Sequence, residues 1–199
     1  MTDGSGFTRR HFLTVATVVT AGAGGVATAV PFVSSFKPSA RAQALGAPVE
    51  RDVSKLEPGQ MVKVEWRGKA VFIVRRTDEM IETLSGIDDL LADPNSENEE
   101  QQPDYITGPL RSLRPEYLVI EGVCTHLGCA PTARFELGPE SADLGDDWPG
   151  GFSCACHGSK FDLSGRVFKS VPAPDNLKVP PHRFVNETTI MIGVDTGAA

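Results

Sequence analysis

Two short segments of this 199-residue chain concentrate the side chains that could bind a metal or form a disulfide. Residues 124–129 read CTHLGC and residues 154–159 read CACHGS, so together they hold all four cysteines and two of the four histidines. Thiolate and imidazole are the usual ligands of zinc and of some iron–sulfur centres. Six such groups within 12 positions predict one site built from both segments.

Three kinds of site are compatible with these residues. Two disulfides would suit a protein outside the cytoplasm, but they leave both histidines unexplained. A zinc site of two cysteines and two histidines is chemically allowed, although it gives no reason for a glycine in each segment. The third is a 2Fe–2S cluster in which two histidines replace cysteines on one iron. This exchange of anionic thiolates for neutral imidazoles raises the reduction potential from about −400 mV to between about −150 and +300 mV.

The surrounding residues resemble those of the Rieske iron–sulfur proteins, specifically the family found in bacterial cytochrome bc1 complexes (ubiquinol–cytochrome c reductases). The second segment continues with FDLSGR at residues 161–166, and a proline loop begins with PAP at residues 172–174 and leads to Asn176-Leu177. The resemblance covers nearly the whole chain. It implies an all-β Rieske domain, an antiparallel β-sandwich with an inserted cluster-binding subdomain at about residues 123–178, tethered to one N-terminal transmembrane helix.

The resemblance also implies a role for each cysteine and histidine of the two segments. Cys124 and Cys154 would be the thiolate ligands of the inner iron, and His126 and His157 the imidazole ligands of the outer iron. Cys129 and Cys156 would form a disulfide between the two loops. Respiratory members of the superfamily usually have the disulfide, whereas Rieske ferredoxins and ring-hydroxylating oxygenases usually lack it. The implied cofactor is one Rieske-type 2Fe–2S cluster.

Residues next to the ligands are expected to tune the cluster and its contact with quinol. Gly128 and Gly158 leave room for close approach of the backbone, whose N–H groups could donate to sulfur. Ser159 resembles the family's serine donor to a bridging sulfur. Leu127 resembles the apolar residue at the tip, which packs at the quinone site; packing within its own loop is the alternative.

Phe161 departs from the commoner respiratory pattern, in which a tyrosine hydroxyl donates to a ligand cysteine. If that bond favours the reduced state by about 1–2 kcal/mol, its loss lowers the potential by roughly 40–90 mV, at ~59 mV per tenfold for one electron. We therefore expect a centre on the lower side of its class. Val171 also stands where a glycine is common, before the proline loop.

The function implied by the resemblance is one-electron transfer from ubiquinol to cytochrome c1. His157 is expected to accept a coupled proton, which makes it the candidate catalytic residue. The implied partners are cytochrome b and cytochrome c1, with two copies of the chain in a dimeric complex. Two other functions stay open: the Rieske subunit of another periplasmic oxidoreductase, such as arsenite oxidase, and a zinc-binding structural module.

An apolar segment near the N-terminus predicts a membrane anchor. Residues 12–36 carry no charge, and as a helix of about 37 Å they would cross a ~30 Å hydrocarbon core, although Pro31 should kink or end that helix. Arg9-Arg10 resembles a twin-arginine export signal, but arginines also flank ordinary membrane helices. Both readings place residues 1–11 in the cytoplasm and the later domain in the periplasm, at the bacterial inner membrane. Small-residue motifs at 40–42 and 42–44 look like cleavage sites, yet the length of the apolar stretch favours retention.

The remaining sequence favours β structure. Residues 37–48 are typical of a linker or hinge, and residues 49–199 are enough for one domain core. Alternation or continuous apolar runs predict four strands, at residues 61–66, 70–75, 117–123 and 188–194, with a turn at 67–69. A helix is expected over residues 81–91.

The charge distribution excludes one class of partner and draws attention to one segment. The formal net charge of −7 argues against nucleic-acid binding. Residues 86–110 carry seven acidic side chains and no basic one. Such a segment is typical of a solvated loop, and a docking surface for a basic partner is the alternative. His182, which lies outside the two cysteine segments, is expected to be structural or exposed.

Overall fold

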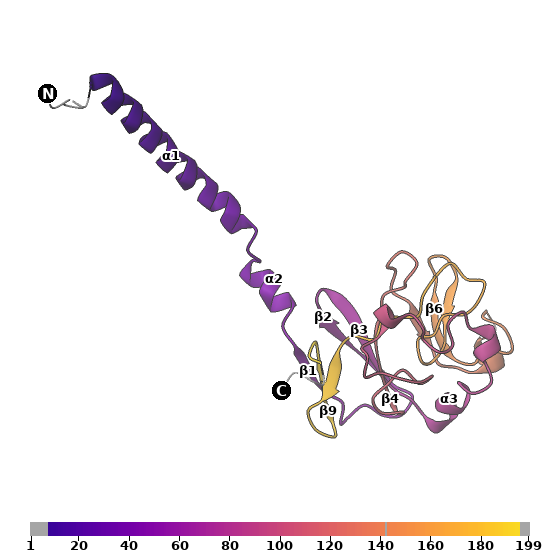
Figure 1. Ribbon diagram of the computed structural model, residues 1–199. Coiled ribbons are helices and arrows are strands. Elements are labelled where there is room, and N and C mark those ends of the chain that lie inside the picture. Colours follow the sequence, from indigo (N-terminus) through magenta and orange to yellow (C-terminus); the bar gives the residue numbers. More distant parts are fainter. Residues whose placement is uncertain (1–7, 142, 196–199) are drawn as a thin grey trace. The chain divides into compact units, whose positions relative to one another are not determined.

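The computed structural model describes residues 8–141 and 143–195 (Figure 1). The chain divides into two compact units, residues 1–44 and residues 45–199. The first unit consists of α1 (Arg9–Ser35) and the start of α2 (Ala40–Leu45). Part of the segment predicted as a linker is therefore helical.

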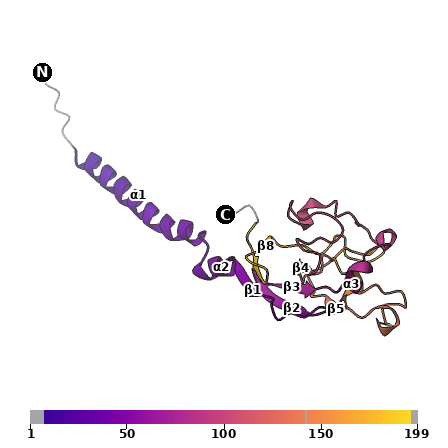
Figure 2. The same ribbon diagram turned by 90° about the horizontal axis from the view of Figure 1, so that it is seen from below.

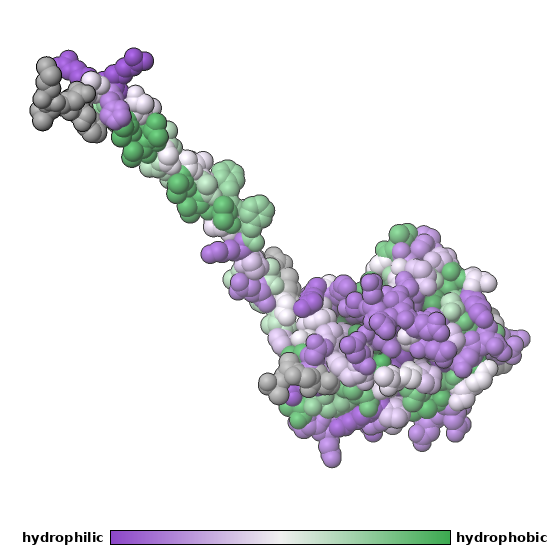
Figure 3. All heavy atoms as spheres, viewed as in Figure 1, coloured by the Kyte–Doolittle hydropathy of each residue, from purple (hydrophilic) through white to green (hydrophobic). Residues whose placement is uncertain are grey.

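Helix α1 is built for an apolar surrounding. It has 27 residues, and its most apolar stretch of 18 residues has a mean hydropathy of 1.7. None of its side chains is buried, and Figure 3 shows its apolar surface in green. Four threonine hydroxyls donate to the carbonyl oxygen four residues earlier, which satisfies them without water: Thr14, Thr17, Thr20 and Thr28. The helix continues through Pro31 and does not end there. Within the described residues, α1 is the one helix long and apolar enough to cross a membrane.

The described residues of the second unit form three antiparallel sheets of three strands each. Their strand orders are β1-β9-β8, β2-β3-β4 and β5-β6-β7. The strands are β1 (Val49–Asp52), β2 (Met61–Trp66), β3 (Lys69–Arg75), β4 (Tyr117–Glu121), β5 (Thr132–Arg134), β6 (Gly151–Cys154), β7 (Ser159–Phe161), β8 (His182–Phe184) and β9 (Thr189–Ile192). The four strands expected from the sequence match β2, β3, β4 and β9, which confirms them within a few residues at each end.

A tight hairpin joins β2 to β3. Arg67 and Gly68 both have positive φ, 52° and 72°, as a two-residue type I′ turn requires. Val64 and Trp66 of β2 are buried while Lys63 and Glu65 are exposed, so the alternation predicted the buried face correctly. Strand β3 is buried on both faces, which explains its continuous apolar run.

The sheet β2-β3-β4 lies between the other two sheets. On one face, Val71, Ile73 and Val119 pack with Ile190 and Ile192 of β9. The other face belongs to a second core that reaches β6 and β7, with Phe72 and Phe152 stacked at 5.9 Å between ring centroids. Figures 1 and 2 agree that the β1-β9-β8 sheet and the β5-β6-β7 sheet lie on opposite sides of β3 and β4. The β5-β6-β7 sheet therefore packs on a buried core that it shares with β2-β3-β4.

The prediction of a helix over residues 81–91 is wrong. Helix α3 begins earlier, at Asp78, because the Thr77 hydroxyl caps it by accepting from the Met80 N–H, and it ends at Glu82. Gly86 then takes a φ of 84°, and only the short 3-10 turn η1 (Asp88–Leu90) follows. Two further 3-10 turns are η2 (Glu99–Gln101) and η3 (Gly138–Ser141).

Candidate metal centre

Two loops of the same local shape carry the cysteines and histidines. In the first, which follows β4, the Gly128 N–H donates to the Cys124 carbonyl at 2.9 Å. In the second, between β6 and β7, the Gly158 N–H donates to the Cys154 carbonyl at 2.9 Å. Each turn thus runs from a cysteine to the glycine four residues later.

The glycines make these turns possible. Gly128 has a φ of 82° and Gly158 a φ of 77°, a region that other residues enter only with strain. A Cβ at either position would meet no protein atom within 4 Å. The reason for glycine that the structure supports is therefore the backbone conformation of the turn, rather than a close approach of protein atoms.

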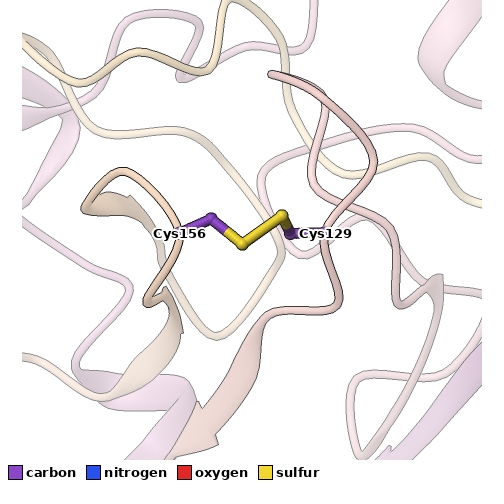
Figure 4. Close-up of a disulfide and its surroundings, with 2 residues drawn as sticks. All are labelled: Cys129 and Cys156. Carbon is purple, nitrogen blue, oxygen red and sulfur yellow. A yellow bond between two sulfur atoms is a disulfide. The ribbon is translucent and has the colours of Figure 1, made fainter.

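A disulfide ties the two loops together. Cys129 and Cys156 are bonded, with their Cα atoms 6.7 Å apart (Figure 4). This confirms the expected pair. It also excludes two plain disulfides, because Cys124 and Cys154 are both free. The Sγ atoms of Cys129, Cys154 and Cys156 lie within 4.8 Å of one another, but only Cys154 of these three remains available as a thiolate ligand.

The two free thiols lie in the interior. Cys124 is 3% exposed and Cys154 is 2% exposed. Burial raises the pKa of the Cys124 thiol, the backbone N–H of His126 and the Ser159 hydroxyl oppose this, and the neighbouring Cys154 adds to it. Two adjacent buried thiolates would repel each other, so a bound cation is what would stabilise both in the charged form.

The two imidazoles lie on the outer side of the same loops. The His126 and His157 rings meet edge to face, with centroids 4.7 Å apart. His157 is exposed and His126 half-buried, and Leu127 at the tip is 72% exposed. The donor set thus has two sulfurs inside and two imidazoles outside, which fits the unequal irons of a Rieske-type cluster.

Ser159 connects the second loop to the proline loop, residues 172–176. Its Oγ accepts from the Ala173 N–H at 3.1 Å, which leaves its own proton free to donate toward Cys124. Phe161 is fully buried in the core beneath the loops and has no hydroxyl to donate. Before the proline loop, Ser170 has a φ of 60°, and Val171 packs against the same core.

The sequence did not reveal a group of buried arginines around residues 162–166, which follow β7. Arg76, Arg111 and Arg166 are at most 2% exposed. Burial lowers the pKa of Arg76 and of Arg111 to about 10, so both stay charged at neutral pH. Arg76 and Arg111 donate to carbonyl oxygens within residues 163–165, and Arg166 pairs with the buried Asp162 at 2.7 Å. Since arginine is usually exposed, composition offers no signal for these three.

His182 takes no part in the site. It is 1% exposed in β8, and its Nδ1 lies 2.8 Å from the Pro180 carbonyl. Of the two expected outcomes, structural or exposed, its burial excludes the second. Its Nε2 is buried without a hydrogen-bond partner in the described part of the chain.

The chain has matches among protein families, curated proteins and solved structures. Residues 1–39 match the family model "Ubiquitinol-cytochrome C reductase Fe-S subunit TAT signal", and residues 96–181 match "Rieske [2Fe-2S] domain". The chain is 58% identical over 191 residues to the ubiquinol-cytochrome c reductase iron-sulfur subunit of Allochromatium vinosum, covering 96% of this chain and 91% of that one. The corresponding subunit of Blastochloris viridis is 44% identical over 187 residues, covering 94% and 93%. Among solved structures, a chain of a hyperthermophilic respiratory Complex III has a TM-score of 0.46 at 25% identity, covering 89% of this chain and 98% of that one.

Proposed function

Because the chain belongs to the iron–sulfur subunits of ubiquinol–cytochrome c reductase, we propose that it takes one electron from ubiquinol and passes it to cytochrome c1. The Rieske domain match and the relatives indicate one Rieske-type 2Fe–2S cluster, which supplies one-electron chemistry when bound. The observation that carries the proposal is the donor set, two free buried thiols and two outward imidazoles on loops joined by a disulfide.

Cys124 and Cys154 would hold the inner iron and His126 and His157 the outer iron. Burial of the thiols supports the first assignment, and the outward imidazoles support the second. Gly128 and Gly158 shape the turns, and the Ser159 hydroxyl is the proposed donor to a bridging sulfur. Such donation favours the state with more negative charge on sulfur, which is the reduced state.

His157 is the residue that we propose to move the proton. It is exposed, so the ring nitrogen that holds no metal can accept a hydrogen bond from the quinol hydroxyl. The cluster would supply the electron acceptor beside this imidazole, so electron and proton transfer would be coupled at one side chain. Leu127 would provide the apolar contact of the tip with the quinone site.

The partners and the location follow from the same family. Cytochrome b and cytochrome c1 are the proposed partners, with two copies of the chain in a dimeric complex. Helix α1 and the twin-arginine match indicate a membrane-anchored subunit of a bacterial complex. Arg9 and Arg10 at the start of α1 support a cytoplasmic N-terminus at the inner membrane, with the Rieske domain in the periplasm.

Electron paramagnetic resonance of the membrane fraction tests the proposal, recorded after ascorbate and again after dithionite with iron and zinc assayed. We expect a Rieske-type signal with ascorbate, its loss in C154S and H157A, and its retention in L127A together with slower ubiquinol oxidation. A signal that needs dithionite would point to a low-potential carrier instead. Zinc in place of iron, with no signal, would overturn the redox function.

A further inference from the structure

A loop of the acidic segment lies against the proline loop. This loop, residues 93–98, holds its own shape. The Asp93 carboxylate accepts from the N–H groups of Glu97 at 2.8 Å and Asn98 at 3.3 Å. Ser96 is 7% exposed and has a φ of 55°. These bonds make the loop a preformed structure rather than a solvated chain.

The loop contacts two consecutive residues of the proline loop, about 80 positions away in the sequence. Asn98 Nδ2 donates to the Asp175 carboxylate at 2.8 Å. Asn176 Nδ2 donates to the Asp93 carbonyl at 3.0 Å and to Ser96 Oγ at 3.2 Å. The Asp175 carboxylate is half-buried, and a charged acceptor strengthens the bond from Asn98.

The main chain of Asp175 continues this contact to the first ligand loop. The Thr125 hydroxyl donates to the Asp175 carbonyl at 2.7 Å. Thr125 stands between Cys124 and His126, the two residues of that loop proposed as ligands. Two hydrogen bonds, both through Asp175, therefore connect Asn98 to the backbone that carries one thiolate and one imidazole.

We propose that the loop 93–98 positions the metal centre, and that Asn98 is a positioning residue acting through Asp175 and Thr125. The inference rests on the ligand assignment proposed above. It gives part of the acidic segment a function that neither the solvated-loop nor the docking-surface interpretation included. The exposed carboxylates of the segment, such as Glu97 and Glu99, take no part in the contact with Asp175.

Exchange of the two partners provides the test, in the complete complex with the full chain. N98D places two carboxylates together, whereas N95D adds the same charge to the same loop at an exposed side chain. N98D/D175N restores one donor and one acceptor with the wild-type net charge. N98A removes the donor without repulsion but also removes the Oδ1 that accepts from the Glu100 N–H, whereas N98D keeps such an acceptor. D175N alone keeps an amide acceptor for Asn98.

At equal iron content, we expect N98D and N98A to change the line shape of the Rieske signal and the midpoint potential, and to slow ubiquinol oxidation several-fold. N95D and D175N should keep the wild-type line shape, and N98D/D175N should regain it. The inference is overturned if N98D behaves as N95D does, or if the exchange restores nothing. A wild-type complex without any Rieske signal would instead refute the proposed function itself.

Discussion

Phe161 is the side chain whose substitution should change the reduction potential of the cluster most directly. It is fully buried and its strand β7 pairs with β6, where Phe152 stands opposite. We predict that F161Y raises the midpoint potential by roughly 40–90 mV, because the new hydroxyl can donate to a ligand sulfur and favour the reduced state. Redox titration followed by electron paramagnetic resonance measures the shift.

F152Y is the matched control, since it adds the same hydroxyl to the neighbouring fully buried ring. It should lower stability by about 1–3 kcal/mol through overpacking and leave the potential unchanged. Equal shifts in both variants would mean that the hydroxyl acts through general disturbance of the core, and not by donation to sulfur.

His182 predicts a pH dependence of stability. Burial lowers its pKa, and this outweighs the opposing effect of the hydrogen bond that its Nδ1–H donates to the Pro180 carbonyl. Its buried Nε2 would lack a partner if protonated. The native state therefore binds this proton less readily than the unfolded state, whose histidine has a pKa of about 6.5. The contribution of His182 to the free energy of unfolding is therefore fully present above about pH 6.5. It is lost as the pH falls from about 6.5 toward the lowered pKa of the folded state, by at most about 1.4 kcal/mol per pH unit.

H182N keeps a donor toward Pro180 and cannot titrate. Chemical denaturation of wild type and H182N between pH 7.5 and pH 5 should show a smaller loss of unfolding free energy in the variant. Parallel curves for the two proteins would contradict the assignment of this pH dependence to His182.

At the scale of elements, the disulfide is the connection that the two ligand loops share. It closes a loop of 27 residues, so its removal should cost about 3–4 kcal/mol in the chain-entropy account. In C129S/C156S we expect the Rieske signal to disappear at a lower denaturant concentration, because the loops are then held only by hydrogen bonds and packing. An unchanged midpoint would show that the cluster ligands alone fix both loops.

How far the sequence predicted each element depends on where its partners lie. The hairpin of β2 and β3 was predictable because alternation and the turn at Gly68 are local signals. The proposed donor set could be read from the sequence because its cysteines and histidines lie close together in two short segments. The prediction of a helix over residues 81–91 was wrong because Gly86 has a positive φ, which interrupts an apolar pattern that suits a helix. Asp88 forms an ion pair with Arg166, 78 positions away in the sequence, and no local sequence pattern predicts such a partner.

At the scale of the whole molecule, Arg9 and Arg10 allow the export route to be separated from simple membrane insertion. We predict that R9K/R10K leaves cluster-loaded protein on the cytoplasmic side. Lysine keeps the positive charge that orients a membrane helix but not the twin-arginine signal. Protease accessibility in spheroplasts measures this. Normal periplasmic exposure of the double variant would mean that the arginines act only as flanking charges.

The division of the chain into two units predicts that anchoring and redox chemistry can be separated. Residues 45–199 contain both hydrophobic cores, all four cysteines and every side chain proposed to act on the cluster. A protein comprising these residues should therefore be soluble and show the wild-type Rieske signal and potential once loaded with iron and sulfide. Because it lacks α1, it should not sustain ubiquinol oxidation in membranes that lack the full-length chain. A soluble form with a shifted potential would show instead that the first unit contributes to the environment of the metal centre, and that the two units are not independent.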